Sequence, residues 1–355
     1  MPCPGPASPR RAAAVTAAAL AAGLLAASSA FAFMGVNPAL ALWRIFTGSF
    51  GSLYGLGETV TKAIPLALTG LGLCLAFQGR LWNIGAEGQL LCGAAAATGA
   101  ALALKGALPA GLMVPLIFLC GFAGGAACGA VPGWLKARFR VNEVISSLLL
   151  NYVCAEFIQY LVYGPWKGKA QFGFPYTDNF AACATLPVLG ATRIHWPTLA
   201  LALLLIPAAH WLLTRTKFGF EVRALGGNPL AARYAGMDPG RTAVLVMALS
   251  GGLAGLAGTG EVAGIHHHLT YPWSISSGYG YSAIIVAWLA RLDARLIIPA
   301  ALFLGGILVG GDAIQTSLHL PASAINLCNG LILLCLIAGE FFLRYRPRWR
   351  PREAA

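Results

Sequence analysis

The dominant pattern in the sequence is the return of apolar stretches of about 17 to 25 residues, long enough to cross a hydrocarbon core as helices. Short segments that carry most of the charges and many prolines separate them. A membrane-spanning strand needs only about ten residues, so this run length excludes strands. We therefore predict an all-α, polytopic membrane protein with about ten transmembrane helices, at residues 12–36, 60–78, 83–104, 109–131, 144–163, 197–213, 242–265, 279–290, 296–311 and 322–343.

Composition agrees with this prediction. Hydrophobic residues make up 58% of the chain and charged residues only 10%, against about 25% charged residues in a soluble domain. Glycines recur three or four apart, as in Gly121 to Gly129 and Gly251 to Gly258. Small residues at this spacing let helices pack closely, so we expect a dense bundle. The stretch 279–290 is short and follows Gly278, and we expect it to be broken or re-entrant.

The Lys and Arg residues predict which ends face the cytoplasm. With the N-terminus inside, all but six of the 24 lie on segments that the ten-helix scheme places in the cytoplasm. Positive charge favours that side, so we expect both termini to be cytoplasmic, with 344–355 a basic tail that contacts anionic lipid. The cations are dispersed between apolar runs, so we expect no nucleic-acid binding. The six exceptions lie at 44, 62, 105, 167, 169 and 193.

The N-terminus allows two interpretations. Arg10 and Arg11 precede a long Ala/Leu run that ends in Ala-Ser-Ser-Ala-Phe-Ala, which resembles a signal peptide with a cleavage site. The run is longer than a typical signal sequence, so we favour a retained first helix. Residues 1–36 would then be a cytoplasmic tip and the first transmembrane helix, and 37–343 the main transmembrane domain. The irregular segment 164–196 falls outside the cell in this scheme.

Residues 214–240 form a basic, glycine-punctuated loop between two apolar runs. The charge places this loop on the cytoplasmic surface of the membrane, where a soluble protein can dock. Asn228-Pro229 is a typical helix start, with Asn as the cap and Pro at the first helical position. Leu230, Arg233 and Tyr234 would then project together from this short helix, because they are three and four residues apart.

Polar residues within the apolar runs mark a candidate path for a solute, since a charge at mid-membrane costs about 2.5–3.5 kcal/mol without a partner. Asn83 and Glu87 are four apart on one helical face, with Gln89 close by. They either line the path or form a buried hydrogen-bond network at a helix break. Asn142 and Glu143 either lie on the path or provide a helix cap and an acidic first turn.

A third polar group lies at 152–163. Tyr152, Glu156, Gln159 and Tyr163 are spaced four, three and four residues apart, which places them on one helical face. Such side chains suit a ligand with a planar base and sugar hydroxyls, or they form a packing face against neighbouring helices. Glu261 and His266 to His268 are interpreted as the solvated outer end of a helix, not as a metal site.

Several kinds of chemistry lack a sequence signature. The chain has no GxxxxGK[ST], HExxH or GxSxG motif, so we expect no bound nucleotide, no cofactor and no catalytic residue in this chain. Its nine cysteines show no CxxC and no ligand-like spacing, and most lie in apolar runs. From the sequence we predict neither a disulfide nor a metal site.

Four motifs resemble one known family. They are Thr69-Gly70 with FQGRLWNIGAEGQLL, VNEVISSLLLNY, FGFEVRALGGNPLAARYAGM, and GEVAGIHHHL followed by SGYGYSAIIVAWLAR. Over about 58–343 the chain resembles the permease subunits of bacterial ABC importers for simple sugars, nucleosides and branched-chain amino acids, most closely those for nucleosides. It departs at Gln78-Gly79-Arg80, where Arg-Ala-Gly is expected, and at the run of three histidines.

The resemblance implies partners for this chain. A cytoplasmic ABC ATPase would use ATP and dock on a coupling helix in 214–240, and an extracytoplasmic lipoprotein would deliver the substrate. A second, related permease would complete the channel in the bacterial cytoplasmic (inner) membrane. A ribose-type sugar remains an alternative substrate, and an ion-coupled carrier an alternative class. The positions that match the family's coupling loop are Gly219, Arg223, Ala224, Gly226, Asn228, Ala231, Ala232 and Gly236.

Overall fold

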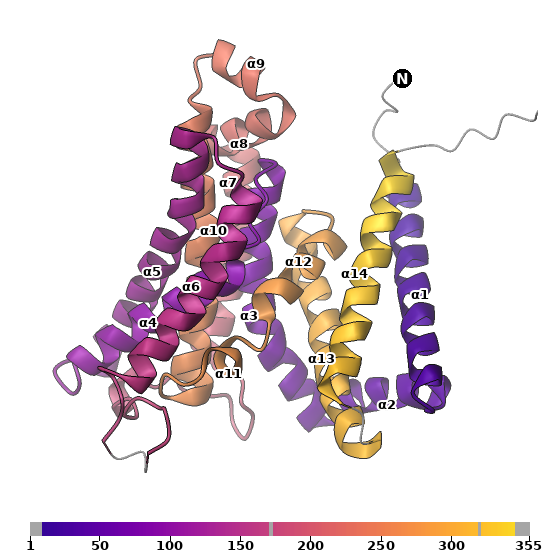
Figure 1. Ribbon diagram of the computed structural model, residues 1–355, viewed down its shortest axis with the longest axis horizontal. Coiled ribbons are helices and arrows are strands. Elements are labelled where there is room, and N and C mark those ends of the chain that lie inside the picture. The colour runs from indigo at the N-terminus through magenta and orange to yellow at the C-terminus, as the bar shows by residue number, and fades with distance from the viewer. Residues whose placement is uncertain (1–8, 170–172, 319–320, 345–355) are drawn as a thin grey trace, which may run out of the picture. The chain divides into compact units, whose positions relative to one another are not determined.

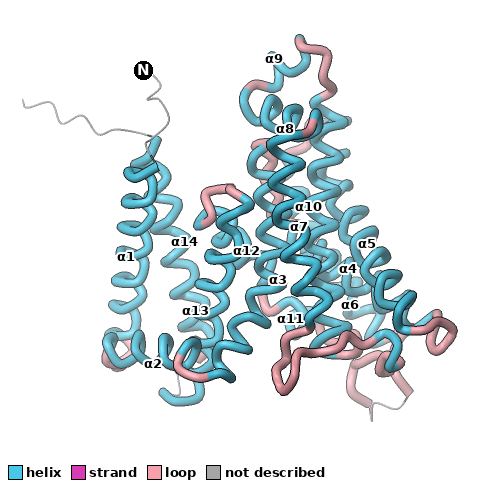
Figure 2. Tube along the Cα trace, turned by 180° about the vertical axis from the view of Figure 1, so that it is seen from behind, coloured by secondary structure: helices cyan, strands magenta, loops and turns pink. Residues whose placement is uncertain are grey.

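The computed structural model describes residues 9–169, 173–318 and 321–344, and these are helical almost throughout (Figures 1 and 2). Within these ranges no strand forms, and Val188 and His195 make an isolated bridge. The α-helices are α1 (Pro9–Phe33), α2 (Pro38–Phe50), α3 (Leu53–Gln78), α4 (Ala86–Ala103), α5 (Ala110–Phe139), α6 (Glu143–Tyr163), α7 (Trp196–Arg215), α8 (Lys217–Gly227), α9 (Pro229–Tyr234), α10 (Pro239–Glu261), α11 (Pro272–Ser276), α12 (Tyr279–Leu289), α13 (Ile297–Leu318) and α14 (Ala322–Arg344).

Seven helices of the described part are long and apolar enough to cross a membrane. They are α1, α3, α5, α6, α7, α10 with its extension to His266, and α13. The helix α12 has only 11 residues, too few to span, and α4 has 18 residues but is not among the candidate spans. The prediction of an all-helical, multi-pass membrane protein is confirmed, whereas the count of about ten spans and the orientation stay predictions.

Helix boundaries differ from the predicted ones where local chemistry overrides the apolar pattern. The helix α5 continues through Pro132 to Phe139, because one missing N–H is tolerated within a well-packed membrane helix. It ends at Arg140, whose φ of 58° is left-handed. The helix α3 begins earlier than predicted because the Ser52 hydroxyl caps it, accepting the Gly55 N–H at 3.0 Å.

The short helix α2 was not predicted. Asn37 caps it by accepting the Ala39 N–H at 3.0 Å, and Pro38 occupies its first turn. Pro38 and Arg44 interrupt the apolar pattern, so a search for long hydrophobic runs missed it. Trp43 and Phe46 of α2 are exposed, at 62% and 58%.

By its internal contacts the chain divides into two compact units, residues 1–51 with 307–355 and residues 52–306. In the first unit α1 and α14 pack antiparallel, since Gly23 faces Ile332 and Gly339 faces Ala19. A small core that includes Phe31, Ala41 and Ile314 completes this unit. The division into 1–36, 37–343 and 344–355 rests on orientation and stays a prediction.

The centre of the second unit is a seam of glycines where α10 meets α4 and α5. A Cβ added at Gly93 would lie 2.2 Å from the Cα of Gly255, and one added at Gly125 would lie 2.2 Å from the carbonyl oxygen of Gly251. Backbones this close leave no room for a side chain. The expected dense packing through small residues is therefore present, and it holds these three helices in fixed register.

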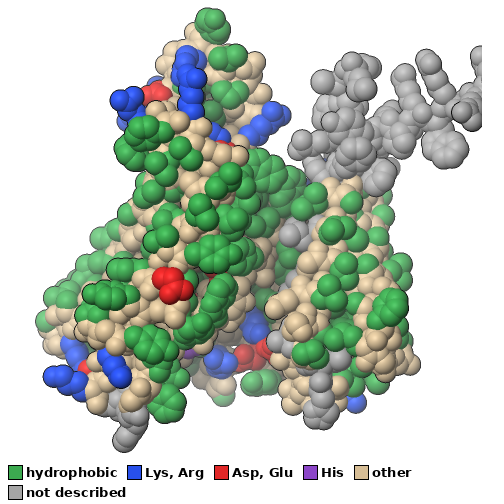
Figure 3. Space-filling view, viewed as in Figure 1, with side chains coloured by type: hydrophobic (Ala, Val, Ile, Leu, Met, Phe, Trp, Pro, Cys, Tyr) green, Lys and Arg blue, Asp and Glu red, His purple; other side chains and the backbone are tan. Residues whose placement is uncertain are grey.

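The two ends of the second unit differ in character. The helices α8 and α9 lie at one end, and the segment 164–196 lies with α11 at the other (Figures 1 and 2). Lys and Arg side chains gather over α8 and α9, and a hydrophobic surface follows below them (Figure 3). Within this unit, the basic loop and the irregular segment thus fall at opposite ends, as the sequence predicted.

The segment 164–196 is irregular, as predicted, and backbone hydrogen bonds fix its described part to the turn after α10. The Thr177 N–H donates to the carbonyl of Leu269 at 3.0 Å, and the Phe180 N–H to that of His267 at 2.8 Å. His195 is fully buried against Gly264, and burial lowers the pKa of its ring to about 4. Neither ring nitrogen has a hydrogen-bond partner among the described residues, and the ring fits against Gly264 because that residue has no side chain.

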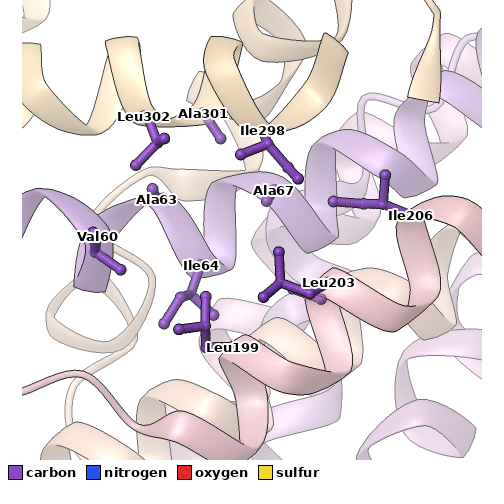
Figure 4. A pocket seen from close by; sticks show the side chains of 11 residues that line it. Val60, Ala63, Ile64, Ala67, Leu199, Leu203, Ile206, Ile298, Ala301 and Leu302 are labelled. Carbon is purple, nitrogen blue, oxygen red and sulfur yellow. The ribbon is translucent and has the colours of Figure 1, made fainter. Parts of the chain in front are cut away.

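A small gap of about 50 Å³ lies where α3, α7 and the start of α13 meet (Figure 4). Ile64, Leu203, Ile298 and the other side chains that line it are all hydrocarbon. Without a polar group it has no means of selecting a solute, so we regard it as a packing defect.

The glycine seam yields a test of the packing. Replacing Gly255 by Ala puts a methyl group against the carbonyl of Gly121, 2.2 Å from its oxygen. Overpacking of this kind costs about 1–3 kcal/mol, so we expect a lower midpoint of thermal unfolding in detergent. Gly111→Ala is the matched control, because Gly111 is also helical and has no atom within 4 Å of an added Cβ. Equal midpoints for both variants would contradict the close approach.

Candidate functional site

The connection between α3 and α4 is an extended break, and Asn83 holds it together. The Asn83 amide donates to Gln89 Oε1 at 2.8 Å and to Ser250 Oγ at 2.9 Å. Its Oδ1 accepts from Gln89 Nε2 at 2.9 Å and from the Gly85 N–H at 3.0 Å. Asn83 and Gln89 are both fully buried. This is the buried network at a helix break, one of the two roles that the sequence left open.

Two side chains of α6 bind the same break. The Ser147 hydroxyl accepts the Ile84 N–H at 3.2 Å. The Asn151 amide donates to the Ile84 carbonyl at 2.9 Å, and its Oδ1 accepts the Gly88 N–H at 2.8 Å. Sequence analysis missed Asn151, although its spacing of four from Ser147 and the facing glycine were available as a signal.

Glu87 lies in the first turn of α4 and points away from this network. Its Oε2 accepts the Gly280 N–H of α12 at 2.7 Å. Its Oε1 is buried and has no hydrogen-bond partner among the described residues. A Cβ at Gly280 would lie 2.3 Å from the Glu87 backbone nitrogen, so only glycine permits this approach. The expected placement of Asn83 and Glu87 on one helical face is wrong, because the helix begins at Ala86, after Asn83.

Beside Glu87 lies a small cavity of about 10 Å³, bordered in part by the exposed side chains of Tyr152 and Trp273. The Asn151 amide also reaches it, donating to the Tyr281 hydroxyl at 3.2 Å. Ligand pockets usually enclose about 300–1,000 Å³, so this cavity is occluded and admits a solute only after helices move. Its lining comes from α4, α6, α11 and α12 and consists of Glu87, Leu91, Asn151, Tyr152, Ala155, Trp273 and Tyr281.

Asn142 and Glu143 fulfil the structural roles considered for them. Asn142 caps α6 by accepting the Val144 N–H at 2.9 Å. Glu143 forms an ion pair with Lys136 of α5, and its Oε1 accepts the Trp82 N–H at 3.4 Å. The two residues thus join the end of α5, the start of α6 and the break between α3 and α4.

The stripe Tyr152, Glu156, Gln159 and Tyr163 lies on one face of α6, as predicted, and this face is on the surface of the unit. Tyr152 and Tyr163 are each 59% exposed. The Gln159 amide donates to Glu156 Oε1 at 3.0 Å, and Glu156 is exposed. Acidic side-chain atoms lie within this otherwise hydrophobic and polar surface over α6 (Figure 3). Only Tyr152 of the stripe borders the occluded cavity.

The segment 214–240 is not a simple loop, because it contains α8 as well as the predicted α9. Buried Gly219, Val222 and Leu225 recur at helical spacing in α8, which a search for transmembrane runs overlooks. The start of α9 is confirmed: Asn228 accepts the N–H groups of Leu230 and Ala231 at 2.9 and 3.2 Å, and Pro229 is the first residue.

The outer side of α9 presents three side chains to the surroundings. Leu230 is 67% exposed and Tyr234 93% exposed, and Arg233 is exposed between them. Ala232 faces inward and is buried. Gly236 then reverses the chain with a φ of 78°, a left-handed conformation that favours glycine.

Three other positions of this segment fix α8 in place. A Cβ at Gly226 would lie 2.1 Å from the Gln78 carbonyl oxygen, and one at Gly219 would lie 2.2 Å from that of Leu212. The Ala224 carbonyl accepts the Asn228 N–H at 3.0 Å, while Arg223 is exposed. Gly226 therefore seats α8 against the end of α3, directly before the break.

The outer end of α10 differs from its interpretation as a solvated turn. Glu261 is only 5% exposed, and a π-helical turn, Val262–His266, follows it. The His268 ring packs on Tyr176, with centroids 4.9 Å apart. The segment 164–196 covers this turn, which a sequence pattern does not show.

A comparison with known families agrees with a multi-pass helical membrane protein. The family described as "Branched-chain amino acid transport system / permease component" matches residues 55–338. The chain belongs to this family of transport permeases.

Individual relatives include permeases for different solutes. The chain is 37% identical to the glucose ABC transporter permease protein TsgB13 of Haloferax volcanii, over 92% of this chain and 87% of that protein. It is 30% identical to the guanosine ABC transporter permease protein NupP of Bacillus subtilis, over 91% and 92%. It is 31% identical to the nucleoside ABC transporter permease protein NupB of Lactococcus lactis, over 80% and 75%.

A double-mutant cycle tests the network at the break. Asn83→Ala removes both hydrogen bonds that the buried Gln89 amide makes with it, and Gln89→Ala removes two of the four hydrogen bonds of Asn83. Loss of partners for a buried amide costs about 1–3 kcal/mol. Because the two amides bond each other, we expect the double variant to lose less stability than the sum of the single losses. The midpoint of thermal unfolding in detergent measures each loss.

Asn179→Ala is the control for this cycle, since Asn179 lies in the segment 164–196 and is exposed. It should leave the midpoint unchanged. Strictly additive losses for Asn83 and Gln89 would contradict a mutual hydrogen-bonded pair.

Proposed function

We propose that this chain is the permease subunit of an ATP-binding-cassette importer that carries nucleosides across the bacterial cytoplasmic membrane. Family membership and relatives described as ABC transporter permeases support the class. The observation that carries the mechanism is the packing of α8 against the end of α3, directly before the break that leads to Glu87, with the exposed face of α9 following α8.

In this proposal a cytoplasmic ATPase docks on Leu230, Arg233 and Tyr234 of α9. Its movement reaches α8, which contacts the Gln78 carbonyl through Gly226. The Gln78 amide in turn donates to the Leu292 carbonyl, beyond the end of α12, at 2.7 Å. A displacement of α8 is thereby passed to the break before α4 and to the end of α12. Glu87 joins α4 to α12, because it accepts the Gly280 N–H.

The occluded cavity is the proposed midpoint of the path. Tyr152, Trp273 and Tyr281 supply aromatic faces on which a planar base can stack, and Glu87 and Asn151 supply hydrogen-bonding groups. Because Glu87 Oε1 lacks a partner among the described residues, it is available to a bound hydroxyl or base N–H. Opening then requires separation of α12 from α4.

The other residues of the candidate path divide between two roles. Asn83, Gln89, Asn142 and Glu143 hold the elements that frame the path, whereas Glu156 and Gln159 lie on the exposed face of α6. A carboxylate facing lipid is costly, so we assign this face to the second, related permease.

The proposed topology keeps about ten spans, with both termini and 214–240 in the cytoplasm. The segment 164–196, at the far end of the second unit from α9, faces outward and receives the substrate-binding lipoprotein (Figure 2). The ATPase subunits use the ATP, and this chain binds no cofactor of its own. Membership in a permease family argues against an ion-coupled carrier.

A sugar is the specific alternative to a nucleoside substrate, because a glucose permease is also a relative. In cells that express this chain with its partner proteins, we expect uptake of radiolabelled guanosine to be competed by unlabelled nucleosides better than by ribose or glucose. A base stacked on the aromatic side chains adds a contact that a free sugar lacks.

Competition by ribose or glucose that equals or exceeds competition by nucleosides would overturn the nucleoside assignment and favour the sugar. Cells that lack the ATPase give the background level of guanosine uptake.

The docking face yields a separate test. Arg233→Glu reverses an exposed charge on α9, so we expect normal amounts of the chain in the membrane and a loss of uptake of about tenfold or more. ATP hydrolysis in the purified complex should no longer respond to the substrate-loaded binding protein. Gly226 is less suitable, since any side chain there also strikes the Gln78 backbone.

Lys105→Glu is the matched control, because it reverses an exposed charge in the α4–α5 connection, outside the docking face. Its uptake should equal that of the unmodified chain. Wild-type uptake by Arg233→Glu would contradict docking at α9.

A further inference from the structure

We propose that Cys92, Cys128 and Cys154 form a binding site for a thiophilic metal ion. They come from three helices, α4, α5 and α6. The Sγ atoms of Cys92 and Cys154 are 3.2 Å apart and those of Cys128 and Cys154 are 3.6 Å apart. All three sulfur atoms lie within 4.8 Å of one another, the sole such group of potential ligands found in the described residues.

The spacing of the sulfur atoms suits a three-coordinate ion. With metal–sulfur bonds of about 2.3 Å, a trigonal ion holds its ligands about 4 Å apart. Two of the observed separations, 3.2 and 3.6 Å, are shorter than this value and the third is at most 4.8 Å, so small side-chain rotations suffice to place the three sulfur atoms around an ion. Since three rigid helices supply one ligand each, the site is largely formed before binding.

The surroundings select the kind of ion. The cysteines line a cavity of about 530 Å³ whose other walls are apolar side chains such as Ala95, Val131 and Phe157. No side-chain oxygen lines it, so hard ions such as Mg²⁺ and Ca²⁺ lack their preferred ligands. Soft ions such as Cd²⁺, Hg²⁺, Ag⁺ and Cu⁺ prefer sulfur.

Charge balance sets the protonation of the bound state. An apolar cavity disfavours net charge, so a divalent ion binds best with two thiolates and one neutral thiol. Two thiol protons leave on binding, and the product is neutral. A monovalent ion needs one thiolate and releases one proton.

The site connects to the proposed transport function through its position. Cys92 follows Glu87 by five residues on α4, and Cys154 follows Asn151 by three on α6. The cavity is lined by α4 and α6 as well as by α12, so an ion that fixes α4 to α6 opposes any widening of the cavity between these two helices. We therefore expect a bound ion to inhibit uptake, an effect that rests on the proposed function, whereas binding itself does not.

The first experiment measures binding of Cd²⁺ to the full chain, purified in detergent under reducing conditions. The test protein retains the three cysteines while Ala replaces the six others. We expect one Cd²⁺ per chain by elemental analysis, with the ultraviolet charge-transfer absorption of cadmium–thiolate bonds. Further replacement of Cys92, Cys128 and Cys154 by Ala should abolish both signals. The six replaced positions are Cys3, Cys74, Cys120, Cys183, Cys328 and Cys335.

A second measurement needs no cysteine replacement at the site. Cd²⁺ should raise the midpoint of thermal unfolding of the three-cysteine protein and slow alkylation of Cys92, the partly exposed member of the group. Absence of both effects, or a stoichiometry unchanged by removal of the three cysteines, would overturn the proposal. So would a Cys92–Cys154 disulfide that persists under reduction.

Uptake is the last readout. Cd²⁺ should lower uptake at least about tenfold in cells with the three-cysteine protein and not in cells with the variant that lacks all three. Binding without inhibition would remove the effect on transport and leave the site. Failure of guanosine uptake without any metal would count against the proposed function alone.

Discussion

The structure of the second unit depends on how a helix break inside the bundle satisfies its own peptide groups. Unpaired N–H and C=O groups are costly where water is excluded, so the break before α4 persists only because side chains replace the missing helical bonds. Asn83 and Gln89 bond each other across it, and Ser147 and Asn151 bond its backbone from α6. The break in turn starts α4 at Ala86, which aims Glu87 at Gly280.

Close contacts at glycines then hold the break rigidly against the neighbouring helices. The seam at Gly93 and Gly255 fixes α10 against α4, and Gly226 presses α8 on the end of α3. Contacts between backbones are short and stiff because no flexible side chain separates them. This rigidity is the physical basis of the coupling proposed between α9 and the cavity.

Much of this was predictable from the sequence where the signal is local. The cap at Asn228, the outward Leu230 and Tyr234, and the close packing of glycines follow from spacing within one segment. Contacts between segments were not predictable. Asn83 was placed on a helical face with Glu87 because periodicity continues through the break, and Asn151 was missed because its partners lie on α4 and α12. The cysteines at 92, 128 and 154 show no motif for the same reason.

The exposed carboxylate of Glu156 has a consequence for assembly. A two-fold axis that passes close to this side chain would set it against its own copy in a medium of low dielectric constant, where like charges repel strongly. Two identical chains would then have to bury a proton or a counterion at their contact. In the proposed assembly, a mate with a different residue at that position avoids this repulsion.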